Sequence, residues 1–232
     1  MLKIIPIFLV SVLLFGCATT ASLDERDPLV EFNRGVYSFN QTMDDLIFDP
    51  ISKLYKAVTP NFLEKGISNF FSNLGDLSVI ANEILQFKFD KAASDVSRVL
   101  VNSTIGLLGF FDVSSEIGLP KHNEDFGQTL AKWGFSSGPY IVLPFFGPTT
   151  LRDLSSLVVD KGILNPMFYI EDDMTRSGLL ALNYIDFKSR SSITHDLIGT
   201  ASLDEYEFIK NAYFEKRAYE ISDGNIADFI EE

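Results

Sequence analysis

The chain has 232 residues, of which 32 are acidic and 19 are basic, so its formal net charge at pH 7 is −13. An acidic surface repels phosphate backbones and anionic headgroups, which argues against nucleic acid as a partner and against electrostatic docking on lipid. Hydrophobic residues still make up 46% of the chain, so any contact with a membrane has to be apolar. The length fits one large domain or at most two.

The N-terminus predicts a lipoprotein signal peptide over residues 1–16. A basic start precedes an apolar run over 4–15 that is too short to cross a bilayer. The run ends in LFGC (14–17), which resembles a lipobox, and Cys17 is the only cysteine in the chain. We therefore expect Cys17 to be acylated and residues 17–26 to form an anchored linker. The alternative is ordinary cleavage after Ala21, which would discard Cys17. Ala18 after the cysteine favours the outer membrane.

A long amphipathic helix is predicted from Pro28 to about Phe48, with Asp27 as its N-cap. Its apolar residues recur every three or four positions, and they are Leu29, Phe32, Val36, Phe39, Met43 and Leu46. Since Pro28 follows Cys17 by only eleven residues, which reach about 40 Å at most, the helix must stay near the bilayer. We expect Leu29, Phe32, Val36 and Phe39 to face the membrane interface. A stripe turned wholly into a helical core is the alternative.

The rest of the chain also predicts helices, which makes the fold class all-α. Asp49-Pro50 and Thr59-Pro60 are start signals, and the helix after Pro60 is expected to end near Gly75. Further helices are expected over 76–88, 90–106, 110–117, 125–133, after a cap at Thr149, from Asp172 or Asp173 to about 198, and from Ser202. Period-two alternation is absent except for one possible short strand over 140–146, which Pro144 argues against in a central position. The acidic tail, 223–232, is expected to be loosely held.

Catalytic and metal-binding motifs have little support. Gly134-Phe135-Ser136-Ser137-Gly138 fits the G-x-S-x-G pattern of serine hydrolases, but the residues before it predict a helix and prolines follow it. The only two histidines, His122 and His195, lie in polar stretches and are expected at the surface. No zinc-ligand spacing is present. Glu171-Asp172-Asp173 could meet a hard cation, but capping of a helix N-terminus explains these charges better. The sequence therefore predicts no enzyme, no metal and no cofactor.

Several longer segments resemble one family. They are DPLVEFNR (27–34), Phe39-Asn40, NFF (69–71), Asn73-Leu74, NSTIG (102–106), GFFDV (109–113), EDFGQTL (124–130), GPYIVLP (138–144), Gly147-Pro148 and LRD (151–153). Together they resemble the MlaA/VacJ outer-membrane lipoproteins, over Asp27 to about Arg217. The departures are local: Leu77 replaces a usual proline, Phe87 a common glycine, Val99 a usual phenylalanine, and Ser155-Ser156 a place often held by glycine.

The resemblance implies a single all-helical domain, 27–222, shaped as a ring with a central amphipathic channel and seated in the periplasmic leaflet of the outer membrane. Family members lie beside trimeric porins and pass phospholipid mislocalised in the outer leaflet to a soluble periplasmic carrier, MlaC. No catalysis or cofactor is implied. In this setting the Pro/Gly-rich segment suits a channel wall, and its predicted lipid-path residues are Tyr140, Leu143, Pro144, Phe145 and Phe146. Two rivals remain: a lipoprotein that only braces a porin or the envelope, and a membrane-anchored esterase.

Overall fold

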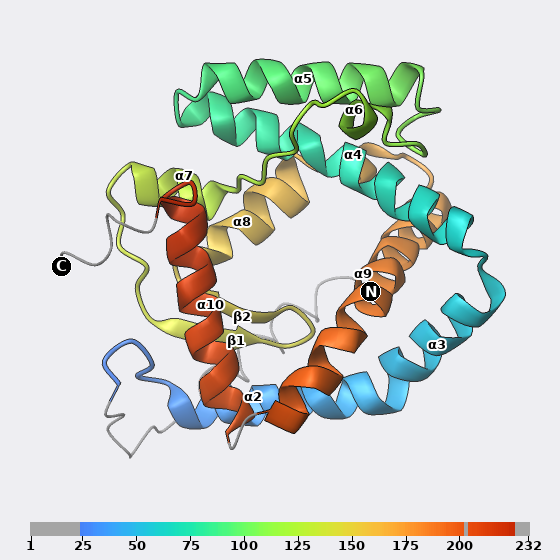
Figure 1. Cartoon of the computed structure of the whole chain (residues 1–232). Coiled ribbons are helices and arrows are strands. Elements are labelled where there is room, and N and C mark those ends of the chain that lie inside the picture. The colour runs from blue at the N-terminus through green and yellow to red at the C-terminus, as the bar shows by residue number, and fades with distance from the viewer. Residues whose placement is uncertain (1–23, 202–203, 226–232) are drawn as a thin grey trace.

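The structure is a computed structural model that describes residues 24–201 and 204–225. Cys17, the predicted signal peptide, Ser202 and residues 226–232 lie outside the described residues, as do the side chains of 191–201, His195 among them. Helices form a ring, and a small β hairpin projects towards its middle (Figure 1). This confirms the all-α class with one hairpin added. Among the described residues, no helix is both long and apolar enough to cross a membrane.

The described residues form helices, short helical turns and two strands. They are α2 (Val30–Met43), a π-helical turn η1 (Asp44–Phe48), α3 (Asp49–Val58), α4 (Asn61–Leu85), α5 (Phe89–Thr104), α6 (Val113–Glu116), α7 (Phe126–Lys132), β1 (Tyr140–Leu143), β2 (Gly147–Thr150), α8 (Leu154–Val158), a second π turn η2 (Val159–Ile163), a 3-10 turn η3 (Pro166–Tyr169), α9 (Asp173–Ala201) and α10 (Glu205–Ile221). Helices α4 and α5 pack as a hairpin along one side (Figure 1).

The first two predicted helices are joined rather than separate. The chain passes from α2 into α3 through η1, and Asp49 makes no side-chain cap there. Pro50 has no N–H to donate to the preceding turn, which fits a π turn directly before it. Helix α9 packs against α3, and its Lys188 binds Asp44 at the start of this turn, at 2.5 Å. Figure 1 shows that the ring bends between α2 and α3.

Helix α4 runs through Gly75, where the sequence predicted a break. Glycine costs a helix interior only about 1 kcal/mol, so packing can override it. Asp76, the expected start of a separate helix, is instead buried and paired with Lys121. The helix ends at the tight turn before α5, where Phe87 has a φ of 62°. Phe87 therefore holds a left-handed conformation, which glycine adopts without strain.

The hairpin is fixed to α2 by two asparagines. Strand β1 pairs antiparallel with β2, from Tyr140 opposite Thr150 to Leu143 opposite Gly147. Asn33 donates to the carbonyl of Tyr140 and accepts from the N–H of Val142, while Asn40 does the same for Leu143 and Phe145. Seven residues of helix and three of strand both span about 10 Å, so the two amides match the free edge of β1.

Several predicted caps are wrong, because tertiary contacts take the same side chains. Asp27 does not cap α2; it is buried and accepts from Asn33 and from the hydroxyl of Tyr206. Thr149 lies in β2, and α10 is capped by Asp204. The first residue of the tail, which was expected to be loosely held, is fixed in place, because Asp223 accepts hydrogen bonds from Lys88 and Lys91. The predicted cap at the start of α9 is confirmed, because Asp172 accepts from Thr175, and the helix predicted over 125–133 is capped by Asp125, which accepts from the third residue of α7.

Candidate functional site: a pocket in an apolar-sided ring

Burial in this protein is inverted: its buried side chains are mostly polar, whereas a water-soluble domain buries mostly hydrophobic ones. Among the side chains that the structure describes, seven hydrophobic residues are buried, against twenty-two polar or charged ones. Thirty-four large hydrophobic residues are exposed at the same time. Water-soluble monomers rarely expose large contiguous apolar areas, so this surface suits lipid or protein contact. Ile105, Leu107 and Leu108, which follow α5, are each about two-thirds exposed.

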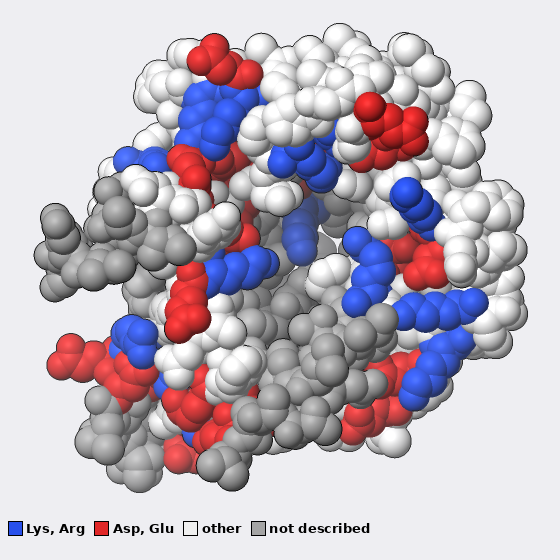
Figure 2. All heavy atoms as spheres, viewed as in Figure 1, with Lys and Arg blue, Asp and Glu red and all other residues white. Residues whose placement is uncertain are grey.

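Charged side chains face inward and hold the ring together. Arg98 of α5 is buried and binds Asp112 just before α6, at 3.0 Å. Asn82 of α4 donates to Asp160 in η2, which also accepts the first N–H of α7. Figure 2 shows that the viewed face is hollowed near its middle and that Lys and Arg side chains gather around the hollow. The interior is therefore polar, and much of the apolar surface lies outside.

A pocket of about 280 Å³ lies between the hairpin and α10. The hairpin gives it an apolar wall, α8 and η2 form a second side, and α10 supplies charged groups. Its lining residues are Asp125, Leu143, Phe146, Gly147, Pro148, Thr149, Asp153, Ser156, Leu157, Lys161, Tyr213, Lys216, Arg217 and Glu220. An apolar wall opposite cationic groups can accept an amphiphile, with its charged end on the cations and its hydrocarbon on the wall.

An ion cluster centred on Arg217 forms the polar side of the pocket. The guanidinium binds Asp125 at 2.6 Å and Asp153 at 3.0 Å, and Tyr213 donates its hydroxyl to Asp153. Burial by itself raises the pKa of both aspartates, but their hydrogen bonds and nearby positive charge outweigh it and hold each pKa below its ordinary value. Both therefore stay ionised, and Arg217 is already neutralised.

Lys161 is the cation that remains available. Its ammonium makes no hydrogen bond or ion pair within the part of the chain that the structure describes. The surrounding protein lowers its pKa by desolvation, and the carboxylates of Asp125 and Asp160 oppose that shift. Lys216, the other lysine of the pocket, lies 3.5 Å from Glu220 with a largely exposed side chain. An anionic group entering the pocket would therefore meet Lys161 without having to displace a hydrogen-bonded ion pair, although the charges of Asp125 and Asp160 lie nearby.

The predicted lipid-path residues all lie on the hairpin, but their side chains have different surroundings. Leu143 and Phe146 line the pocket. Pro144 and Phe145 are exposed at the turn, and the Phe145 ring packs edge-on against Phe39, with ring centroids 5.5 Å apart. Tyr140 lies apart from the pocket: its side chain is completely buried in the cluster with Val142 and Tyr206, so it supports the hairpin from behind.

The apolar stripe of α2 is divided as well. Leu29 and Phe39 are exposed, at 37% and 41% of their surface. Phe32 is half-buried, and Val36 packs against the buried cluster behind the hairpin. One edge of the stripe therefore faces outward while the other holds the hairpin. Placement of Leu29, Phe32, Val36 and Phe39 at a membrane interface stays a prediction.

The comparison with known proteins decides the family. The model of the family described as MlaA lipoprotein matches residues 25–220. The chain belongs to the MlaA lipoprotein family.

Similar proteins extend the match over nearly the whole chain. The intermembrane phospholipid transport system lipoprotein MlaA of Escherichia coli is 30% identical over 232 residues, which cover 97% of this chain and 91% of that protein. An uncharacterized protein of Rickettsia felis is 35% identical over 84% of this chain and 78% of its own length. A solved structure, described as the structural basis for maintenance of bacterial outer membrane lipid asymmetry, superposes with a TM-score of 0.73 at 28% identity. The match covers 84% of this chain and 98% of the chain in that structure.

In this MlaA-family chain, Ser136 lacks the setting of a hydrolase nucleophile. It is exposed in the loop between α7 and β1, so a helix precedes it and a strand follows. The nucleophile elbow needs the opposite order, a strand before the serine and a helix after it. The G-x-S-x-G match therefore reflects a glycine-rich turn.

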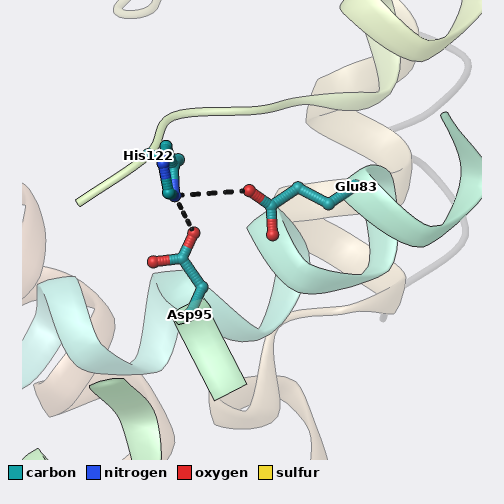
Figure 3. A group of neighbouring side chains, drawn as sticks. All are labelled: Glu83, Asp95 and His122. Carbon is teal, nitrogen blue, oxygen red and sulfur yellow. Dashed lines mark hydrogen bonds and ion pairs between the residues drawn. The ribbon is translucent and has the colours of Figure 1, made fainter. Parts of the chain in front are cut away.

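His122 is not the surface histidine that the sequence predicted. Its Nδ1 lies 2.8 Å from an oxygen of Asp95 and 3.6 Å from an oxygen of Glu83, and both carboxylates are buried (Figure 3). The three residues come from α4, α5 and the connection between α6 and α7. No motif links them in sequence, because only the packing of the α4–α5 hairpin brings them together.

Proposed function

We propose that this protein is a lipid-anchored outer-membrane component of intermembrane phospholipid transport. In this role it removes phospholipid mislocalised in the outer leaflet and passes it to a periplasmic carrier, which maintains the lipid asymmetry of the membrane. The observation that carries the proposal is the inverted burial, with an apolar exterior and a polar interior. The similarity to lipoproteins named for intermembrane phospholipid transport supports it.

A ring of this kind can sit in a single leaflet. Its exposed hydrocarbon meets acyl chains, and backbone that is not helical, such as the hairpin, is tolerated at membrane depth where protein or water covers it. A phospholipid headgroup would then follow the polar interior as a central channel. We infer that Lys161 binds the lipid phosphate, while Leu143, Phe146 and Leu157 contact the hydrocarbon next to it.

The anchor is part of the same proposal. Acyl chains on Cys17 and a linker over 17–26 would hold the domain of 27–222 at the periplasmic leaflet, since two or more chains give a stable anchor. Cys17→Ser should leave the protein uncleaved or released from the outer membrane in cell fractionation. A mature N-terminus at Ser22 by mass spectrometry would contradict acylation.

The proposed partners are phospholipid, a trimeric porin beside the ring and a soluble MlaC-type carrier. Neither nucleic acid nor a cofactor belongs to the proposal, and neither does catalysis. Native mass spectrometry of the protein extracted from outer membrane reports bound lipid and partner together. Co-purified phospholipid favours transport, whereas porin binding without lipid would favour the bracing role.

The direct test is transfer of labelled phospholipid from membrane to carrier. Lys161→Glu should cut the transfer rate by about tenfold or more, because it replaces the free cation with a charge that repels phosphate. Lys53→Glu is the matched control, since it makes the same charge change at an exposed position on α3 outside the pocket. Equal transfer by wild type and Lys161→Glu would remove the pocket from the lipid path.

A further inference from the structure

Two buried carboxylates meet one imidazole between α4, α5 and the connection from α6 to α7. One ligand atom each from Glu83, Asp95 and His122 lies within 4.8 Å of the others. The two acidic side chains are at most 1% exposed, whereas His122 is about one-fifth exposed. Figure 3 shows that both carboxylates point at the same ring nitrogen from two neighbouring helices. The cluster is thus closed on the helix side and reachable only past His122.

Glu83 has no hydrogen-bond donor in this position. Both of its carboxylate oxygens are buried without a hydrogen-bond partner, and so is Oδ1 of Asp95. A buried carboxylate left without donors costs several kcal/mol, so native proteins rarely keep one without a compensating cation or proton. The side chain aims its oxygens into the cluster, towards His122.

The neighbouring cations are engaged elsewhere. Arg98 approaches Asp95 at 3.7 Å, but its terminal nitrogens bind Asp112, Ser115 and the carbonyl of Leu119. Lys121 pairs with Asp76, and Lys88 and Lys91 pair with Glu124 and Asp223. Arg98 can offset Asp95 in part, whereas Glu83 has His122 beside it and only the more distant charge of Lys91 in addition.

We propose that Glu83, Asp95 and His122 form a binding site for one divalent transition metal, with Zn²⁺ as the best fit. One imidazole nitrogen and two carboxylate oxygens form a ligand set that suits Zn²⁺. Tetrahedral ligands at about 2.0–2.2 Å from the metal lie about 3.3–3.6 Å apart. The Glu83–His122 spacing of 3.6 Å already fits, and the Asp95–His122 spacing of 2.8 Å has to open by about 0.5–0.8 Å. Water would complete the shell from the exposed side of His122.

Burial and the charge of Asp95 both raise the pKa of Glu83, because this position stabilises a carboxylate poorly without a cation beside it. The site goes beyond lipid transport. His122 lies three residues before Asp125, which caps α7 and binds Arg217 at the pocket. A metal would fasten this connection to the α4–α5 hairpin and steady one side of the pocket.

The test uses the full mature protein in detergent, first treated with EDTA and then dialysed with Zn²⁺. We expect about one Zn²⁺ per chain by elemental mass spectrometry and a higher melting temperature that EDTA reverses. Glu83→Gln and His122→Gln should bind Zn²⁺ more than about tenfold more weakly and lose the Zn²⁺-dependent shift. Asp186→Asn is the control, because it removes a buried carboxylate of α9 outside the cluster. This variant should keep both the Zn²⁺ affinity and the Zn²⁺-dependent shift in melting temperature.

The wild-type measurement decides the proposal even where a variant fails to fold. Far less than one Zn²⁺ per chain, with no shift in melting temperature, would overturn it. In that case the hydrogen bond between His122 and Asp95 accounts for the cluster. Stoichiometric binding that survives both substitutions would also overturn it, because the metal would then lie elsewhere.

Discussion

Replacement of Asn33 by leucine should show how firmly α2 holds the hairpin. Asn33 is completely buried and makes three hydrogen bonds through its amide, to Asp27, Tyr140 and Val142. Leucine has a similar size but cannot donate or accept. The substitution therefore leaves a buried N–H and a buried carbonyl of β1 without these partners and takes one donor from the Asp27 carboxylate.

Each unsatisfied buried backbone group costs about 1–3 kcal/mol, so the two together cost about 2–6 kcal/mol. A chain of this size loses about 2–4 °C in melting temperature per kcal/mol, which predicts a fall of roughly 5–20 °C. The fall can be followed in detergent through the fluorescence of Trp133, the only tryptophan in the chain. Lipid transfer should fall with it, because the hairpin carries Leu143 and Phe146 into the pocket.

Asn61→Leu is the matched control, because Asn61 is exposed at the first turn of α4. It should change stability by no more than about 0.5 kcal/mol. If Asn33→Leu melts within about 2 °C of wild type, the two asparagine bridges do not stabilise the hairpin as argued above.

Four further predictions address the membrane face, the ion cluster, the loop serine and one strained turn. Phe39→Asp should lower the stability of the unacylated protein by only about 1–2 kcal/mol but weaken its binding to vesicles by tenfold or more. A loss of several kcal/mol in stability would instead assign Phe39 to core packing. Arg217→Gln should lower the free energy of unfolding by about 3 kcal/mol at pH 7. Because the pKa values of its aspartate partners lie below their ordinary 3.8, the difference from wild type should shrink in unfolding titrations below about pH 4. A difference that stays constant with pH would contradict this. Ser136→Ala should leave lipid transfer unchanged, and stoichiometric labelling of Ser136 by a fluorophosphonate would refute that assignment. Phe87→Gly should raise the melting temperature by a few degrees, because glycine removes about 1 kcal/mol of left-handed strain, and an unchanged melting curve would show no such strain.

Sequence alone determined the features that neighbouring residues encode. The caps at Asp125 and Asp172 were predictable, because a capping side chain binds an N–H only a few positions ahead. The motif segments also predicted the family, including DPLVEFNR and GPYIVLP. Asn33 belongs to one of these segments, and the structure supplies its physical role as a bridge to β1.

Tertiary structure decided which environment each pattern meets. Periodicity predicts that a helix has an apolar face, but not whether that face turns to protein or to lipid, so Val36 and Phe39 of one stripe have different surroundings. Tertiary packing likewise carried α4 through Gly75 and took Asp27 away from its predicted cap. His122 joined Glu83 and Asp95 only through the packing of three separate segments. Such contacts depend on the energy of the whole packed chain, and a short stretch of sequence carries no signal for them.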